Sequence, residues 1–426
     1  MYDWANSAYI TTAVGLLPIY FATAVVGPGG VRWRNTVFAA DTVWAFMVGA
    51  AALLVFLAAP VLGAVADFSA AKKKFLLAFA YTGALFTLLL YFSHSGDVAR
   101  TMVFFLITQV SFIGANVMYD AFLPQIASDR EMDRVSAKGY AFGYIGGGVQ
   151  FALALVLISK PEWFGMSAGL AARTGIAMAG LWWAGFTIVT WRGLHEPESR
   201  YQLPEQYRRW PRAAAMVAVG LERTIATTKR VRRFRHLVLF LLAFMFYNEG
   251  IQTVINMAAA YGSEELKFTP QVLMGTLLVI QFVAMGGALL FGKLIAPWLG
   301  TKRAIMAALV IWSGVVVYAY QMNSPREFFV LGVIVGLVMG GSQALSRSYY
   351  GSMVPEDASA EFYGFYTVFT KFSSIWGPFA FGAIKQMTGS SRLAILSLIV
   401  FFLAGLTLLW LVNEEKAREA RSAGAF

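Results

Sequence analysis

The segment at 63–74, GAVADFSAAKKK, has a counterpart at 292–303, GKLIAPWLGTKR, and this pair decides the predicted fold. Both segments begin with a glycine that follows an apolar run, and both end in two cations. A second pair of similar segments is SAKGYAF at 136–142 and SAEFYGF at 359–365. The pairs occur in the same order along the chain, so the sequence predicts two parallel copies of one helical unit, as in many membrane transporters.

The composition indicates a polytopic membrane protein. Of 426 residues, 58% are hydrophobic and only 13% are charged, whereas soluble domains carry about 25% charged residues. Twelve apolar segments are long enough to cross the hydrocarbon core as helices. They are 4–26, 41–66, 75–92, 101–123, 136–159, 174–191, 236–261, 271–294, 304–321, 327–348, 360–384 and 393–412. We therefore expect an all-α membrane protein with twelve transmembrane helices in two six-helix pseudo-repeats.

The predicted domains follow from the long connection in the middle of the chain. They are an N-terminal six-helix bundle (1–192), a cytoplasmic connection (193–235), a C-terminal six-helix bundle (236–413) and a cytoplasmic tail (414–426). The connection carries Met216, Leu221 and Ile225 near one face of a basic segment. This pattern is typical of a helix that lies on an anionic membrane surface; a solvated basic linker is the alternative.

The net charge of +11 is better explained by the orientation of the protein in the membrane than by binding of nucleic acid, because the basic residues lie between the spans. Loops after even-numbered spans, together with the tail, hold most of the 34 Lys and Arg residues. The positive-inside rule then places both termini in the cytoplasm. We expect a multi-pass protein of the bacterial cytoplasmic (inner) membrane.

Polar residues recur in every third span, which suggests a central cavity lined by the first helix of each group of three. Spans 1, 4, 7 and 10 carry polar stripes at helical spacing, whereas the cores of spans 3, 6, 9 and 12 have no acid, base, Asn or Gln. Interhelical hydrogen bonds that hold a bundle together are the alternative. The predicted substrate-facing residues are Asn6, Asn116, Tyr119, Asn248, Gln252, Asn256, Gln343 and Arg347.

Several motifs carry a resemblance to a known family. GAVADFSAAKKK resembles the loop between spans 2 and 3 of the major facilitator superfamily. YDWANSAY at 2–9, YDAFLP at 119–124 and FYNEGIQTV at 246–254 resemble the "unknown major facilitator" group, which is related to fungal autophagy-linked vacuolar effluxers. The resemblance implies twelve spans and amino-acid efflux. The acid of span 7 is usually Asp in that group, and it is Glu249 here.

The charged residues suggest a gate and a proton-coupling pair. We expect Asp67 to lie near the N-terminus of span 11, at 359–360, and to gate the cavity with Lys72, Lys73, Lys74 and Asp120. Arg347 is either the partner of an anionic substrate group or a salt-bridge partner of Asp120. Glu249 and Lys371 lie at similar depth in spans 7 and 11, so we expect them to pair and Glu249 to take up a proton.

Other chemistries find no support in the sequence. The chain has no cysteine and its three histidines lie far apart, so we expect no metal site and no cofactor. No nucleophile–base arrangement suggests an enzyme. The main hypothesis is a monomeric secondary transporter that moves a small polar solute by efflux, with protons and membrane lipid as further partners. The alternatives are a facilitator of lysolipids and a non-transporting receptor or scaffold.

Overall fold

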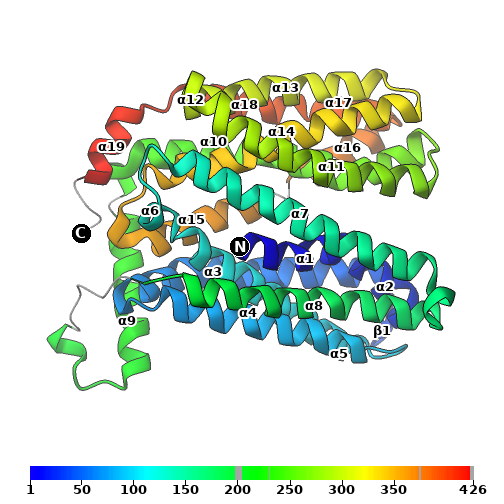
Figure 1. Ribbon diagram of the computed structural model, residues 1–426, viewed down its shortest axis with the longest axis horizontal. Coiled ribbons are helices and arrows are strands. Elements are labelled where there is room, and N and C mark those ends of the chain that lie inside the picture. The colour runs from blue at the N-terminus through cyan, green and yellow to red at the C-terminus, as the bar shows by residue number, and fades with distance from the viewer. Residues whose placement is uncertain (197–203, 230, 374–375, 423–426) are drawn as a thin grey trace. The chain divides into compact units, whose positions relative to one another are not determined.

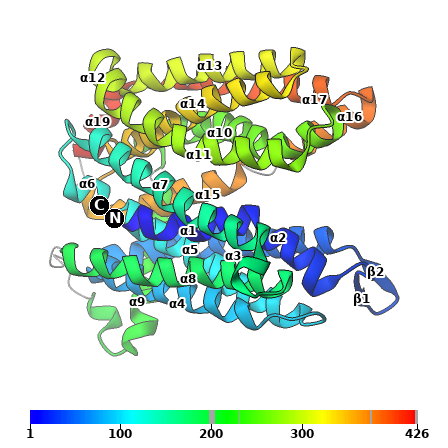
Figure 2. The same cartoon turned by 45° about the vertical axis from the view of Figure 1, so that its right-hand side comes forward.

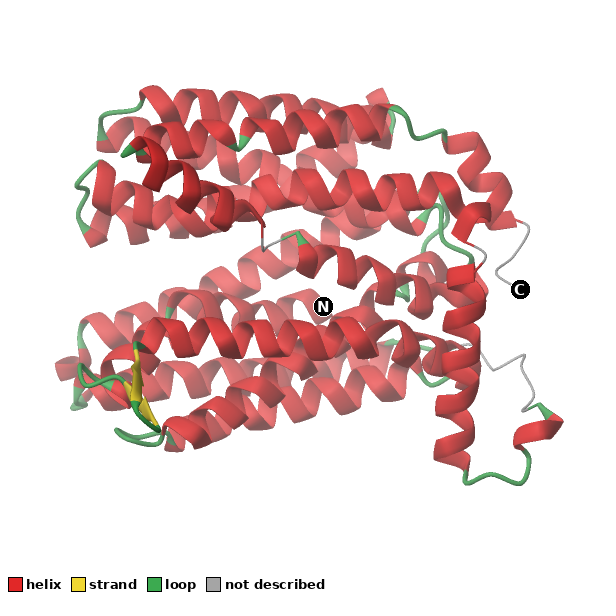
Figure 3. Cartoon of the chain, turned by 180° about the vertical axis from the view of Figure 1, so that it is seen from behind, coloured by secondary structure: helices red, strands yellow, loops and turns green. Residues whose placement is uncertain are grey.

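The computed structural model describes residues 1–196, 204–229, 231–373 and 376–422. Almost all of this chain is helical, as Figure 3 shows. Within the described residues the only strands are β1 (Val31–Trp33) and β2 (Thr36–Phe38), which pair antiparallel with Val31 opposite Phe38. The hairpin lies between the predicted spans 4–26 and 41–66. Three-residue strands are too short to produce an alternation that the sequence could reveal.

The helices of the first half of the chain end at Gly193. They are α1 (Tyr2–Gly15), α2 (Leu17–Tyr20), the π-helical turn η1 (Phe21–Val26), α3 (Ala40–Ser69), α4 (Lys72–Leu89), α5 (Val98–Asp120), α6 (Leu123–Ile126), α7 (Met132–Ser159) and α8 (Ala168–Gly193). The connection contains α9 (Arg212–Lys229).

The helices of the second half begin at Arg235. They are α10 (Arg235–Ala260), α11 (Pro270–Leu290), the π-helical turn η7 (Phe291–Ile295), α12 (Ala296–Leu299), α13 (Thr301–Gln321), α14 (Pro325–Gly351), α15 (Ser359–Phe372), α16 (Trp376–Thr388), α17 (Ser391–Ser397), α18 (Ile399–Trp410) and α19 (Glu414–Ser422).

Every predicted span coincides with one or more of these helices. Among the described residues, nine helices are long and apolar enough to cross a membrane, and Tyr2–Gly15 with Leu17–Val26 forms a tenth span bent by 44°. α8 has the length but is less apolar, and the predicted span 360–384 is divided between α15 and α16. These two spans account for the difference from the predicted twelve.

The chain forms two compact units that do not follow the predicted division at 192 and 236. Unit 1 contains 1–59, 69–119 and 142–201, and unit 2 contains 60–68, 120–141 and 202–426. The end of α3 and the start of α7 thus belong to the unit that holds the second half of the chain. Pro60 stands inside α3 at the boundary between the two units; proline has no backbone N–H to donate to the residue four positions earlier.

In unit 1, α8 lies against α1 (Figure 1), and aromatic stacking joins the two helices. The rings of Trp4 and Trp182 stack with centroids 5.6 Å apart, as do those of Tyr9 and Trp183. Trp183 is fully buried and its edge fills the space beside Gly83 of α4. Such pairs add about 0.5–1.5 kcal/mol each beyond burial of their area, so α8 joins α1 to α4.

Glycines hold α14 against α11 in unit 2, where the two helices lie side by side (Figure 2). A Cβ atom at Gly340 would lie 2.0 Å from the carbonyl oxygen of Ala284, and one at Gly287 would lie 2.1 Å from that of Leu337. Gly332 and Gly336 face α11 in the same way. The repeat of Gly332, Gly336 and Gly340 is therefore a close-packing stripe, as small residues at that spacing predict.

Gly340→Ala is expected to destabilise the protein by about 1–3 kcal/mol, because the new methyl group forces two backbones apart. Gly314→Ala on α13 is the matched control, since nothing lies within 4 Å of its Cβ position; alanine there is neutral or slightly stabilising. Thermal unfolding of both variants in detergent checks this. Equal melting temperatures of the two variants would show that close packing does not depend on Gly340.

Candidate functional site

Glu249 of α10 faces the point where α15 ends and α16 begins. Its Oε1 accepts a hydrogen bond from the backbone N–H of Gly377, 2.5 Å away, in the first turn of α16. The side chain is only 2% exposed. The first amides of a helix have no partner within the helix and carry its positive dipole end. The carboxylate of Glu249 thus lies beside backbone N–H groups that have no acceptor within α16.

The backbone at this point comes so close to α10 that only glycine fits. A Cβ at residue 377 would lie 1.8 Å from Oγ1 of Thr253 and 2.9 Å from Oε1 of Glu249. Gly377 thus lets α16 start directly against the polar face of α10.

The predicted ion pair between Glu249 and Lys371 is absent. No ion pair within the described part of the chain includes Lys371, and the Glu249 carboxylate binds the Gly377 amide instead. The prediction assumed that span 11 was one continuous helix. Because α15 ends at Phe372 and α16 starts at Trp376, an amide of the second helix becomes available to the acid.

The other polar residues of α10 extend this cluster. Nδ2 of Asn248 donates to the hydroxyl of the buried Ser373, which follows α15 directly. Nε2 of Gln252 lies 3.5 Å from Oδ1 of Asn248, and Asn256 is exposed. Gln343 is half-buried on α14. We call Asn248, Glu249, Gln252, Ser373 and Gly377 the break cluster.

In unit 1 the predicted residues also form hydrogen bonds. Nδ2 of Asn6 donates to Oδ1 of Asn116 at 2.6 Å, and the hydroxyl of Tyr119 donates to Oδ2 of Asp3 at 2.7 Å. These bonds join α1 to α5. The eight predicted substrate-facing residues thus divide into three in unit 1 and five in unit 2. Hydrogen bonds join Asn6 to Asn116 in unit 1 and Gln252 to Asn248 in unit 2.

Asp67 makes the contact that its sequence position predicts. Its Oδ2 accepts a hydrogen bond from the backbone N–H of Glu361 at 2.9 Å, in the first turn of α15. Four residues earlier, a Cβ at Gly63 would lie 2.1 Å from the carbonyl oxygen of Ala360. Glycine and aspartate on successive turns of α3 therefore seat the N-terminus of α15.

The second copy of the motif forms an equivalent contact. A Cβ at Gly292 would lie 2.2 Å from Cβ of Ala137 and 3.0 Å from the carbonyl oxygen of Asp133, on α7. Gly63 and Gly292 are the first residues of the two repeated segments, and Ala360 and Ala137 are the second residues of the other pair. Both contacts lie within unit 2, so each repeat motif packs on the start of the matching helix from the other half of the chain.

Polar partners differ between the two contacts, since Ala296 replaces the aspartate in the second. Near the second contact, Oδ2 of Asp133 accepts from the Thr301 hydroxyl at 2.6 Å, and Oδ1 accepts from the Ser348 hydroxyl. The start of α7 is thereby joined to α13 and α14.

Arg347 is a salt-bridge residue in this structure. Its Nη1 lies 3.0 Å from Oδ1 of Asp120, while Nε and Nη2 donate to the hydroxyl and carbonyl of Ser136. The guanidinium also lies over the Tyr140 ring, 4.3 Å from its centroid, and the residue is 4% exposed. With its donors engaged on α5 and α7, the alternative role as substrate ligand is not available to Arg347 here.

Comparison with known proteins fits this architecture. The family model described as "Vacuole effluxer Atg22 like" matches residues 1–422. The chain belongs to this family. It is 35% identical to the "Uncharacterized MFS-type transporter YxiO" of Bacillus subtilis, over 98% of this chain and 95% of that protein. It is 27% identical to "Autophagy-related protein 22-1" of Aspergillus clavatus over 67% of this chain, and it spans about half the length of that fungal relative.

A solved structure gives the fold of this Atg22-like chain. The proton:xylose symporter XylE, a member of the major facilitator superfamily, aligns with a TM-score of 0.69 over 99% of this chain and 96% of its own, at 12% identity. The protein therefore has the major facilitator fold, with twelve helices in two repeats, and is a multi-pass membrane protein of the transporter class.

The predicted lysines of this Atg22-like protein lie at the start of α4 in unit 1. The backbone amides of Lys72 and Lys73 donate to the carboxylate of Glu196, and Nζ of Lys73 donates to the carbonyl of Leu194 at 2.6 Å. Glu196 is half-buried, and burial raises its pKa although both amides oppose the shift. These contacts join α4 to the segment after α8.

Sequence reasoning missed several residues of the site. Glu361 is fully buried beside Asp67, and Arg421 of α19 pairs with Asp129 at 2.6 Å and with Glu356 at 2.9 Å. Gly377 had a visible signal, because GP at 377–378 inside a predicted span favours a helix start. Arg421 had none, since a basic residue in a polar tail is most often solvated.

Glu249→Leu is expected to lower the free energy of unfolding by about 1–3 kcal/mol, because the Gly377 amide loses its acceptor in a buried place. Glu249→Gln retains an acceptor oxygen and should lose less. Thermal unfolding in detergent at neutral pH compares the two, with Gln252→Leu as the control one turn away. If Glu249→Gln and Glu249→Leu lower the free energy of unfolding equally, the hydrogen bond to α16 does not account for the stabilising effect of Glu249.

Proposed function

We propose that this protein is a secondary active transporter that moves a small polar solute by alternating access. The proposal rests on the paired contacts of Gly63 with Ala360 and of Gly292 with Ala137. Gly63 faces the backbone of Ala360, and Gly292 faces the Cβ of Ala137 and the carbonyl oxygen of Asp133. The first contact also carries a carboxylate-to-amide bond. Such contacts separate at modest energetic cost, which suits a gate that opens and closes in each cycle.

The sidedness of the proposed gate follows from the distribution of basic residues. The positive-inside rule assigns the ends of α3 and α14 and both termini to the cytoplasm. We therefore propose that the gate contacts are cytoplasmic, in a bacterial inner membrane, and that the protein acts as a monomer. Lys72, Lys73, Lys74 and Asp120 belong to this proposed gate, Asp120 through its salt bridge with Arg347.

The proposed substrate is a small polar metabolite such as an amino acid, moved by efflux. The amides of Asn6 and Asn116 in unit 1, and those of Asn248 and Gln252 in unit 2, are neutral hydrogen-bonding groups of the kind that such a solute needs. The family description "Vacuole effluxer" supports the direction.

Proton coupling is assigned to Glu249. Protonation removes the negative charge that stabilises the first amides of α16, and a neutral carboxyl is a weaker acceptor. The bond between α10 and α16 would then loosen, and the two helices could move relative to each other. Protons and substrate would in this way act on the same break cluster.

Asp67→Ala is expected to favour the state in which the gate is open to the cytoplasm. Loss of about 1 kcal/mol at the α15 N-terminus changes the equilibrium about fivefold. Because the chain has no cysteine, Ser359→Cys is a clean reporter: the residue is fully buried in the closed gate, and its labelling rate by a membrane-impermeant maleimide should rise severalfold. Asp41→Ala, at the opposite end of α3, serves as the control. An unchanged rate in Asp67→Ala would count against the gate.

Glu249→Gln resembles the protonated acid, so it should retain substrate exchange and lose pH-driven accumulation. Uptake and counterflow of radiolabelled amino acids in proteoliposomes, with and without a pH gradient, separate the two activities. Glu265→Gln, which removes an acid paired with Arg392 outside the break cluster, should retain both. Normal pH dependence in Glu249→Gln would exclude this residue as the proton carrier. Absence of any flux by the wild-type protein would favour a receptor or scaffold, and flux of lysolipids alone would favour the lysolipid facilitator.

A further inference from the structure

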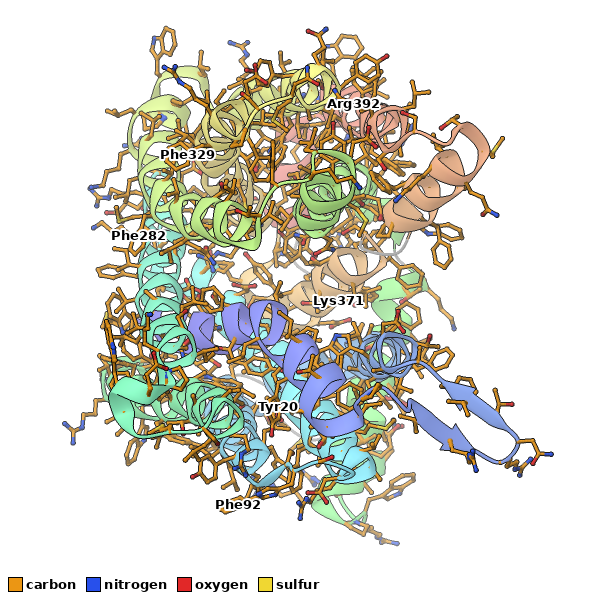
Figure 4. All side chains as sticks on the ribbon, turned by 90° about the vertical axis from the view of Figure 1, so that its right-hand side faces the viewer. Tyr20, Phe92, Phe282, Phe329, Lys371 and Arg392 are labelled. Carbon is orange, nitrogen blue, oxygen red and sulfur yellow. The ribbon has the colours of Figure 1, made fainter. Side chains whose placement is uncertain are left out.

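Lys371 places a cation beside the break cluster. It lies in the last turn of α15 (Figure 4), two residues before Ser373, which Asn248 binds, and six before Gly377, which Glu249 binds. It is twelve residues beyond the start of α15, or roughly 18 Å along the helix. The ammonium group therefore belongs to the middle of a membrane-spanning segment.

Within the described part of the chain, Lys371 takes part in no ion pair, and Glu249, the acid predicted as its partner, is engaged with Gly377. Arg347, the buried cation of α14, is paired with Asp120. Charged groups inside a membrane protein normally pair with one another or face water or a ligand. Lys371 thus lies at the depth where charged residues are usually functional, and no acid among the described residues forms an ion pair with it.

We propose that Lys371 binds the anionic group of the transported substrate, a carboxylate or a phosphate, and this inference rests on the proposed transport function. The anion role that the sequence suggested for Arg347 passes to Lys371, because the guanidinium is held by α5 and α7. Asn248 and Gln252 supply neutral donors and acceptors at the same level of the helices. Lysine binds such anions as a compact point charge with three donors.

A structural role for Lys371 makes different predictions. A cation in the last turn of a helix interacts favourably with the carbonyl end of the helix dipole. This role would change the stability of the protein without changing ligand selectivity, so a readout of anion preference distinguishes the two roles.

The test compares wild type, Lys371→Gln and Lys371→Arg in nanodiscs of phosphatidylcholine, which contain no anionic lipid. Lys293→Gln is the matched control, since this exposed lysine lies in η7. Thermal shifts are measured with L-glutamate, succinate and inorganic phosphate, each against a neutral analogue such as L-glutamine. A separate arm compares lysophosphatidylglycerol with lysophosphatidylcholine, so that a lipid headgroup and a free solute are distinguished.

The expected result is that at least one anionic probe stabilises the wild type more than its neutral analogue does. Its affinity should fall at least tenfold in Lys371→Gln, return in Lys371→Arg and remain unchanged in Lys293→Gln. A response restricted to lysophosphatidylglycerol supports the anion site with a lipid as its source.

Two results would overturn the inference. One is an unchanged anion preference in Lys371→Gln, and the other is a wild type that no anionic probe stabilises. Transport of L-glutamine by wild type and Lys371→Gln alike would then leave the proposed function intact. Failure of every solute to move in proteoliposomes, with anion binding still dependent on Lys371, would instead refute transport alone.

Discussion

The bond between Glu249 and the Gly377 amide joins two features that would each be unfavourable alone. A charged carboxylate at the bilayer centre costs about 2.5–3.5 kcal/mol by insertion scales, and a helix start at that depth leaves backbone donors unsatisfied, each at several kcal/mol. Here the acid satisfies the amide and the amide stabilises the acid. Ser373 and Asn248 form a similar bond at the end of α15. The polar face of α10 and the division of span 11 thus require each other.

This interaction also explains where sequence reasoning succeeded and where it failed. The depth of Glu249 and the polar character of its helix follow from spacing alone. The partner does not, because pairing two charges of similar depth assumes that both helices are continuous. An apolar stretch such as 375–384 has no periodicity that separates one long helix from two short ones. Only the proline at 378 marks the second helix start, and proline also occurs inside transmembrane helices such as α3.

The contact of Asp67 with the start of α15 is easier to predict from the sequence, because its chemistry is local. A glycine and an aspartate four residues apart lie on one face of a helix, and only a helix N-terminus offers backbone amides to that face. The sequence predicted the contact of this segment with the start of span 11. It made no prediction for Gly292, which contacts the start of α7 in the structure. The salt bridge of Arg347 was one of two predicted roles. Choosing between them required knowing that Ser136 and Asp120 surround its guanidinium, which no spacing within α14 reveals.

The two copies of the repeated contact differ in their polar groups, which bears on the proposed gate. The contact at Gly63 has an ionisable acceptor, Asp67, directly on the α15 amide, whereas the contact at Gly292 has Ala296 at that position. Polar bonding near the second contact comes instead from Asp133 and Arg347. The first contact thus places a carboxylate on the end of a helix, and the second has a methyl group at the same position. α15 runs for fourteen residues from the first contact and carries Lys371 in its last turn, and Ser373 of the break cluster follows it directly. The contact with an ionisable acceptor is therefore the one at the start of the helix that leads to the proposed substrate and proton groups.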